Sequence, residues 1–337
     1  MLTRLDRFAY HSQHLSFLIN ATVMQEAARF VTRHPRPVIG AHELTLLDRR
    51  RRELHARDLA NVDAGAYPRE LLFDIPVRGF LRALPALLRD APRVVRRKRD
   101  NDFRDIPVVD KTRYPAYYRR TFHWQTDGYF SDHSAAVYEL GVELLFRGTA
   151  DVMRRMIIPP ITAFARGVAR PLKILDVGCG TGRTLHQLWR SDPSHRLHGV
   201  DLSPAYVRAA RKRLEAVGEL TLAVENAEAL PWADATFDVV TSVYMFHELP
   251  RNARRNVLRE MLRVVRPGGL IVIEDSAQPA DSPEIAAVLH DFPRDFHEPF
   301  YDDYLADDLA VALTEVGARV ESSEPHLVAK VVVAHRR

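Results

Sequence analysis

Glycines at alternate positions, with an acidic residue just ahead of them, form the stretch of this sequence best suited to chemistry. These residues are Asp176, Gly178, Gly180 and Gly182, and a helical pattern starts directly after them at Arg183. The apolar run around Asp176 is typical of a buried parallel strand. Glycine lets the backbone adopt positive φ and approach a ligand closely, and a helix start offers unpaired N–H groups. The pattern predicts a strand, a tight turn and a helix that together bind a ligand.

The glycine spacing separates this turn from a dinucleotide-binding turn. The latter spaces its glycines as G-x-G-x-x-G and normally has an apolar residue where this chain has Asp176. A nicotinamide-dependent oxidoreductase is therefore an alternative hypothesis and not the leading one. The segment 174–182 instead resembles the first motif of the class I S-adenosylmethionine-dependent methyltransferases. The resemblance implies that Asp176 and the three glycines lie at an S-adenosylmethionine site.

Later segments extend the resemblance. Asp201 ends the next predicted strand, 196–200, at the distance expected for a carboxylate that holds two ribose hydroxyls. The segment 225–232 is similar to the family's adenine-side loop, with Asn226 in place of the usual acid. The Asn226 amide could accept from the adenine amino group and donate to a ring nitrogen. By the same resemblance, Leu202, Ala227 and Tyr244 are expected at the cofactor.

Two histidines are the candidates for a general base. Methyl transfer from a sulfonium is an in-line displacement, so a base is needed only if the acceptor has a proton to lose. His247 follows the fourth predicted strand and is the first candidate, because imidazole titrates near neutrality; it could equally be a helix-entry histidine bonded to the backbone. His297 is the second candidate and lies in an insertion, 276–299, after the fifth strand.

Each of these histidines is followed by a glutamate, which raises the question of a metal. Neither His247-Glu248 nor His297-Glu298 has the H-E-x-x-H spacing that places two histidines on one helix face. The sequence therefore assigns no metal ligand, and a metal site would require the pairs to converge in space.

The fold expected for residues 156–337 is a Rossmann-like α/β domain. Its seven-stranded, doubly wound sheet is mostly parallel and has an antiparallel last strand. Arg266-Pro-Gly-Gly269 is expected to form a turn before the fifth strand, and residues 304–316 to form one helix. In such sheets ligands bind beyond the carboxyl ends of the strands. Most of the polar candidates above follow such ends, so we expect them on one rim.

Residues 1–155 are expected to form a mostly helical N-terminal domain. Helical periodicity covers 14–30, with Pro35 and Pro37 ending it, and resumes over 43–59 and 134–156. Aromatic residues crowd 114–138. By resemblance to related enzymes this aromatic cluster is a lid and substrate wall, and the alternative is a plain aromatic core.

Two basic segments have alternative readings. The run 49–52 is four arginines, which usually form a solvated face. The segment 75–99 alternates apolar residues with arginine and could lie on an anionic membrane surface. The alternative is a helix packed on its own domain. Pro76, Pro85 and Pro92 are expected to interrupt any long continuous face.

The amino-acid composition limits the classes of protein to which this chain could belong. The 48 basic residues are balanced by 44 acidic ones, which leaves a net charge of +4 and implies no global nucleic-acid surface. Cys179 is the single cysteine, so no intramolecular disulfide can form and a reducing compartment is expected. No apolar run reaches the ~18 residues of a membrane span. A soluble, cytoplasmic protein is expected.

The leading hypothesis is therefore a methyltransferase that uses S-adenosylmethionine and a small organic acceptor. Residues 226–231 and 247–250 look closest to the ubiquinone and menaquinone C-methyltransferases, which implies an apolar or quinone-like acceptor. A polar-metabolite O- or N-methyltransferase and a non-catalytic S-adenosylmethionine-binding module remain alternatives. The oligomeric state is left open.

Overall fold

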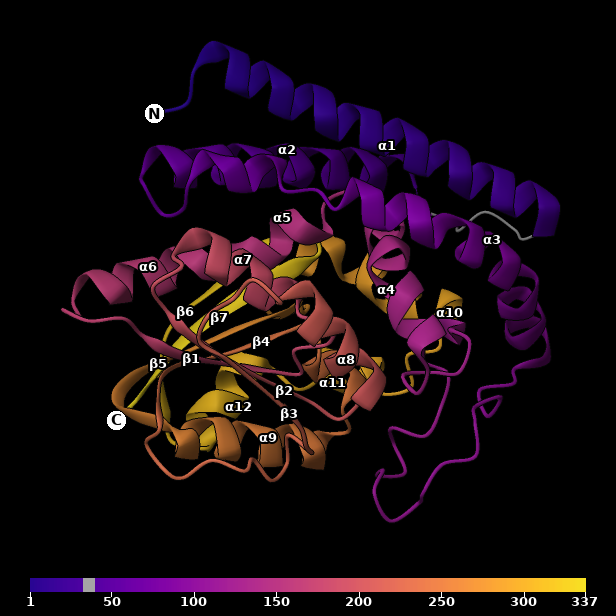
Figure 1. Ribbon diagram of the computed structural model, residues 1–337. Helices are drawn as coiled ribbons and strands as arrows, with labels where there is room; N and C mark the ends of the chain where they lie inside the picture. Colours follow the sequence, from indigo (N-terminus) through magenta and orange to yellow (C-terminus); the bar gives the residue numbers. More distant parts are fainter. Residues whose placement is uncertain (33–39) are drawn as a thin grey trace.

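A single seven-stranded sheet forms the centre of the molecule in the computed structural model (Figure 1). The structure describes the backbone of residues 1–32 and 40–337, and the side chains of these except 27–32, 294 and 295. The strand order is β3-β2-β1-β4-β5-β7-β6, and β7 runs antiparallel to both β5 and β6. The strands are β1 (Lys173–Val177), β2 (Arg196–Asp201), β3 (Leu220–Val224), β4 (Phe237–Val243), β5 (Val265–Ser276), β6 (Ala318–His326) and β7 (Ala329–Arg336). The predicted doubly wound sheet with an antiparallel last strand is confirmed.

Both faces of the sheet are buried, which explains why its central strands are almost continuously apolar. Side chains alternate along β1: Ile174 packs into one hydrophobic layer, and Leu175 and Val177 pack into the other. Helices α6 and α7 lie on one side of the sheet and α9 and α12 on the other (Figure 1). The C-terminal helices are α6 (Ile158–Arg166), α7 (Arg183–Ser191), α8 (Pro204–Arg213), α9 (Arg251–Val264), α10 (Ala286–Asp295), α11 (Tyr301–Leu305) and α12 (Leu309–Glu315).

The N-terminal region is helical, as predicted, and lies along one side of the sheet domain (Figure 1). Its helices are α1 (Arg4–Thr32), α2 (Ala41–Asp63), α3 (Val77–Asp100), α4 (Asp132–Leu145) and α5 (Ala150–Arg154). Short 3₁₀ turns are η1 (Arg69–Phe73), η2 (Phe122–Trp124), η3 (Arg155–Ile157), η4 (Phe246–Glu248) and η5 (Pro283–Ile285). The expected helix end at Pro35 and Pro37 lies outside the described residues.

Three local predictions need correction. The helix expected over 134–156 is divided into α4 and α5, where Gly148 adopts a left-handed φ of 85°. The helix expected over 304–316 is divided into α11 and α12, because the Asp308 side chain caps α12 by accepting from the Val311 N–H at 2.8 Å. The turn expected over 266–269 lies within β5, which begins at Val265.

The prolines of the basic segment do not divide it. Pro85 and Pro92 both lie inside α3, contrary to the expectation that they would interrupt a continuous face. A proline inside a helix leaves the carbonyl four residues earlier without its donor. Here the residues with such carbonyls are Leu81 and Leu88. Both residues are exposed, so water can reach the helix where these carbonyls lie.

The arginine run 49–52 is only partly solvated. Arg49 and Arg52 are exposed, as expected, but Arg50 is buried. Its guanidinium donates to the Ser282 hydroxyl at 3.1 Å and pairs with Glu284. This contact connects α2 to the insertion after β5. The two segments are far apart in the sequence, so helical periodicity could not predict that they meet.

A buried ion pair anchors α2 to the junction before the sheet domain. The Asp58 carboxylate is fully buried and pairs with Arg155 of η3. It also accepts from the hydroxyls of Tyr10 at 2.6 Å and Tyr67 at 2.5 Å. Burial would raise the pKa of Asp58, but Arg155 and these hydrogen bonds hold it below its usual value. The domain boundary near residue 156 stays a prediction, and this anchor lies beside it.

Helix α1 carries a line of exposed apolar side chains. They recur at helical spacing and are Leu5, Phe8, Leu15, Ile19 and Val23. Within the described residues, none of the helices has both the length and the apolarity that a membrane crossing would require.

Candidate functional site

The glycine turn after β1 lies against β2 and opens at the carboxyl edge of the sheet. The N–H groups of Gly178 and Cys179 both donate to the Val200 carbonyl at 2.9 Å. Gly178 has φ of 73°, and a Cβ there would lie 2.6 Å from the Met245 sulfur. No other residue fits this position without displacing Met245, which explains the glycine.

Asp201 lies at the end of β2 beside this turn. Its carboxylate accepts from the Gly180 N–H at 2.9 Å and from the Ser203 N–H at 2.8 Å. Burial raises the pKa of Asp201 to about 6. The carboxylate is therefore ionised at neutral pH and available to two vicinal hydroxyls.

One cavity brings together most of the predicted cofactor residues. Those that line it are Gly178, Gly180, Asp201, Leu202, Asn226, Ala227 and Tyr244. Sequence reasoning missed further lining residues, which include Val200, Tyr206, Glu225, Val243, Met245 and Leu249. The Asn226 side-chain oxygen accepts from the Glu228 N–H at 2.9 Å, which leaves its NH₂ group to donate. An acid for the ribose, an amide for the base and a glycine turn that allows close approach to the backbone are a set that fits S-adenosylmethionine.

Two predicted cofactor residues lie behind the cavity rather than in its lining. Asp176 is 1% exposed and accepts from the Thr241 hydroxyl at 2.7 Å. Burial raises the pKa of Asp176 to about 7. Gly182 caps α7, and a Cβ there would lie 3.0 Å from both Ala210 and Leu214. Both residues hold the turn in place from behind.

The aromatic cluster supplies the opposite wall of the cavity. Its lining members are Tyr117, Tyr118, Phe122, Tyr129 and Tyr138. Phe122 and Tyr129 also pack on Tyr206 of α8, so the cluster is at once a wall and a core. The cavity encloses about 110 Å³. Ligand pockets usually measure roughly 300 Å³ or more, so a cofactor would need more room than this arrangement offers.

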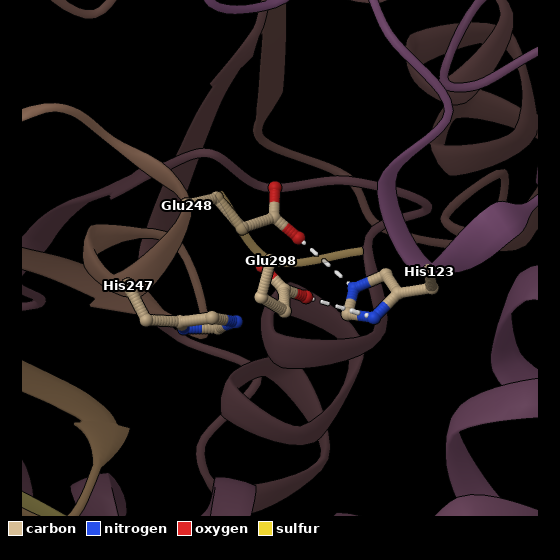
Figure 2. A group of neighbouring side chains, drawn as sticks. All are labelled: His123, His247, Glu248 and Glu298. Atoms are coloured by element: carbon tan, nitrogen blue, oxygen red, sulfur yellow. Dashed lines mark hydrogen bonds and ion pairs between the residues drawn. The ribbon is translucent and has the colours of Figure 1, made fainter. Parts of the chain in front are cut away.

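Next to the aromatic wall, four side chains from distant parts of the chain converge (Figure 2). They are His123, His247, Glu248 and Glu298, and their potential ligand atoms lie within 4.8 Å of one another. His123 Nε2 is 3.1 Å from a Glu248 oxygen, and His123 Nδ1 is 2.9 Å from a Glu298 oxygen. Glu248 also accepts from the Tyr129 hydroxyl at 2.5 Å and lines the cavity. We call these four side chains the His/Glu cluster.

His247 belongs to this cluster but does not line the cavity. Its Nδ1 is 2.6 Å from the Asp275 carboxylate, and its side chain is 10% exposed. Burial alone would lower the pKa of His247, but Asp275 outweighs it and raises the pKa to about 9. The base role of His247 stays a prediction, and its ring reaches the cavity only through the cluster.

His297 lies apart from the cavity and the cluster. Its ring stacks on Phe103 with centroids 5.0 Å apart and also contacts Trp124. Burial lowers the pKa of His297 to about 4. Its partner in sequence, Glu298, turns into the cluster instead, and His123 takes the place that the sequence reasoning had considered for His297.

Sequence reasoning missed His123 as a polar site residue. The signal available was its place within an aromatic-rich stretch that also contains Asp127-Gly128. Its backbone is unusual, with φ of 53° at His123 and 58° at Trp124. Left-handed residues other than glycine are rare and concentrate at functional sites, but no sequence pattern predicts them.

Comparison with known proteins agrees with this geometry. Residues 174–269 match the family described as "Methyltransferase domain". A malonyl-[acyl-carrier protein] O-methyltransferase from Geobacter sulfurreducens is 34% identical over 159 residues, which cover 46% of this chain and 58% of that protein. A demethylmenaquinone methyltransferase from Anoxybacillus flavithermus is 33% identical over 132 residues, 38% of this chain and 51% of that protein. The chain thus spans little more than half the length of these relatives.

A solved S-adenosylmethionine-dependent methyltransferase from Methanosarcina mazei is 20% identical, covers 53% of this chain and 97% of its own, and superposes with a TM-score of 0.42. The family match covers the glycine turn, the carboxylate after β2 and the Arg-Pro-Gly-Gly segment of β5. Residues 174–269 are thus similar to a methyltransferase domain, and the strand order of the sheet around them agrees with that similarity.

Proposed function

We propose that the protein transfers the methyl group of S-adenosylmethionine to a small organic acceptor. The observation that carries the proposal is that a single cavity joins the glycine turn and Asp201 to an aromatic wall ending at Glu248. A cofactor bound at the turn would therefore face a second, differently built surface.

The chain's part in such a reaction is mainly positioning. S-adenosylmethionine supplies a methyl group on a positively charged sulfur. Asp201 would hold the ribose, Asn226 the adenine, and the glycine turn the amino-acid end. The aromatic wall would orient the acceptor and exclude water. Fixing acceptor and methyl in line accounts for much of the rate of such a displacement.

The wall chemistry favours an acceptor with an apolar or aromatic body. Tyr117, Tyr118, Phe122, Tyr129 and Tyr138 line this side of the cavity, whereas Glu248 is its acidic group. Ring faces accommodate flat apolar molecules, and tyrosine hydroxyls can bond an oxygen at the edge. Two relatives are named for such substrates, demethylmenaquinone and 2-methyl-6-phytyl-1,4-hydroquinone. A hydroxylated, quinone-like acceptor fits these features best.

Transfer of labelled methyl from S-adenosylmethionine into a cell extract tests the proposal. We expect label in the organic phase with the natural chain and none with Asp201→Ala. Label only in the aqueous phase would replace the quinone-like acceptor by a polar metabolite. Binding of S-adenosylmethionine without any transfer would contradict the enzymatic assignment and favour a cofactor-binding module.

We also propose that α3 contacts anionic lipid. We place the protein in the cytoplasm, because a chain whose single cysteine is Cys179 forms no intramolecular disulfide and suits a reducing compartment. One exposed face of α3 combines apolar side chains with arginines: Val77, Arg78, Leu81, Arg82, Leu88, Arg89 and Arg93. Arginine near an anionic leaflet contributes about 1 kcal/mol per residue. Such a contact would bring the cleft near apolar acceptors.

Vesicle sedimentation tests this contact. The chain should sediment with phosphatidylglycerol vesicles and not with phosphatidylcholine vesicles. The double variant Arg82→Glu with Arg89→Glu should stay in the supernatant, while its affinity for S-adenosylmethionine stays unchanged. Equal sedimentation of both proteins would contradict the contact.

A further inference from the structure

We propose that His123, His247, Glu248 and Glu298 bind one divalent transition-metal ion beside the acceptor side of the cavity. The four side chains come from η2, η4 and the segment before α11, and Figure 2 shows them directed toward a common centre. Sequence spacing gives no metal motif, so the site is assembled by the fold alone.

The donor set suits a transition metal. Two imidazoles and two carboxylates are ligands that Zn²⁺, Mn²⁺ and Fe²⁺ share, whereas Mg²⁺ and Ca²⁺ prefer oxygen alone. The potential ligand atoms already lie within 4.8 Å of one another. Metal–ligand bonds of about 2.0–2.2 Å would draw them somewhat closer.

Glu298 provides an independent reason to expect a cation. Its side chain is fully buried, and neither carboxylate oxygen has a hydrogen-bond partner. The 2.9 Å approach of His123 Nδ1 lacks hydrogen-bond alignment, so Nδ1 is itself without a hydrogen-bond partner. A buried carboxylate whose charged neighbour, His123, lacks this alignment is only partly compensated. A metal ion at the centre would satisfy it.

Asp275 prepares His247 for this role. Its carboxylate lies 2.6 Å from His247 Nδ1, which leaves Nε2 as the nitrogen facing the cluster. Asp275 is itself held by the N–H groups of Phe246 and Ser276, both at 2.7 Å. Metal-binding histidines commonly donate their second N–H to a carboxylate in this way, which fixes the tautomer and ring orientation.

The backbone at His123 is held in an uncommon conformation to reach the cluster. His123 and Trp124 are successive non-glycine residues with positive φ. Such residues are strained and persist only where the surroundings hold them. This backbone brings the His123 imidazole within reach of both Glu248 and Glu298.

The site adjoins the cavity through Glu248, which is at once a cluster member and a lining residue. Four protein ligands leave room for a further ligand on an ion that accepts five or six. This consequence rests on the proposed function: an acceptor hydroxyl could bind there and lose its proton to solvent more readily. Methyl transfer would then form the O–CH₃ bond, break the S–CH₃ bond and release S-adenosylhomocysteine.

Metal titration of tag-free, chelator-treated protein tests the site without any enzymatic assay. Calorimetry with Zn²⁺ and visible absorption with Co²⁺ should both show saturation at one ion per chain. Glu298→Gln should weaken binding at least about 100-fold, and Asp275→Asn, which acts through His247, by about 10- to 100-fold. His290→Gln is the matched control, because His290 is exposed and lies outside the cluster, and it should bind as the natural chain does.

Circular dichroism and S-adenosylmethionine affinity establish that each variant is folded. Should Glu298→Gln not fold, His123→Gln provides the same comparison. Absence of saturable binding, or binding by Glu298→Gln as tight as by the natural chain, would overturn the metal site. Saturable binding without methyl transfer would instead count against the proposed function, so the two failures are distinguishable.

Discussion

The two walls of the cavity are built in contrasting ways. The cofactor wall comes from short loops that follow consecutive strands, with Gly178 and Gly180 after β1, Asp201 at the end of β2 and Asn226 after β3. The acceptor wall comes from the N-terminal region and the loop after β4, and the insertion after β5 adds Glu298 to the adjoining His/Glu cluster. The first is local in sequence, and the second depends on contacts across the whole chain.

This difference has a physical consequence. Residues on one loop keep their spacing whenever that loop folds, because the strand before it fixes their positions. His123 and Glu298 meet only if the N-terminal helices dock on the sheet domain. The acceptor wall should therefore be far more sensitive than the cofactor wall to changes in the N-terminal region.

Removal of the Asp58 carboxylate is the strongest test of that dependence. Asp58→Ala would leave the Arg155 guanidinium buried without its partner, which costs about 3–5 kcal/mol of the free energy of unfolding. Chemical denaturation followed by circular dichroism measures the loss. Arg7→Ala is the control, since Arg7 forms a more exposed ion pair, and it should cost less than about 1 kcal/mol. Equal losses would mean that the buried pair is not an anchor.

A change at Asp201 should affect cofactor binding and leave the His/Glu cluster unaffected. Asp201→Ala should raise the dissociation constant of S-adenosylmethionine by about 100-fold, because hydrogen bonds to a charged group are worth about 1.5–3 kcal/mol. Zn²⁺ affinity at the His/Glu cluster should not change. Calorimetry measures both, with Asp234→Ala, an exposed carboxylate, as the control. Unchanged cofactor affinity would remove Asp201 from the site.

Lowering the pH should weaken cofactor binding. Because burial raises the pKa of Asp201 to about 6, the carboxylate becomes neutral as the pH falls through that value. The neutral form holds ribose hydroxyls less well, so the dissociation constant should rise about fivefold between pH 6 and pH 5. Titrations with S-adenosylhomocysteine from pH 5 to 7.5 measure this. Asp201→Asn should flatten the profile, and a flat profile in the natural chain would contradict the assignment.

The smallest effect is expected at the edge of the acceptor wall. The Tyr117 hydroxyl donates to Glu228 at 2.7 Å while its ring lines the cavity. Tyr117→Phe removes one hydrogen bond and keeps the ring, so KM for the acceptor should rise only about 2- to 12-fold. Cofactor affinity should stay the same. A change in cofactor affinity larger than the change in KM would place Tyr117 on the other wall.

The same contrast decides what the sequence could predict. The strand, turn and helix around Gly178, the place of Asp201 at a strand end and the doubly wound sheet with its antiparallel last strand follow from local patterns, and the structure has them. Asp176 and Gly182 were expected at the cofactor, and in the structure they lie behind the cavity lining, because residue type does not show which side of a loop a position faces.

The His/Glu cluster could not be predicted from sequence patterns. His297 and Glu298 are neighbours in sequence, yet only Glu298 enters the cluster, because the chain places His297 against Phe103. His123 replaces it from a segment more than a hundred residues away. No periodicity relates these positions, and the left-handed backbone at His123 follows from docking rather than from local preference.

A crystal structure of the chain with S-adenosylhomocysteine would test the central claim most directly. We predict that its ribose lies on Asp201, its adenine beside Asn226, and its sulfur directed toward Tyr129 and Glu248. The aromatic wall should be displaced outward relative to the arrangement described above. A ligand bound elsewhere, or with its sulfur turned away from that wall, would contradict the claim that one cavity joins cofactor and acceptor.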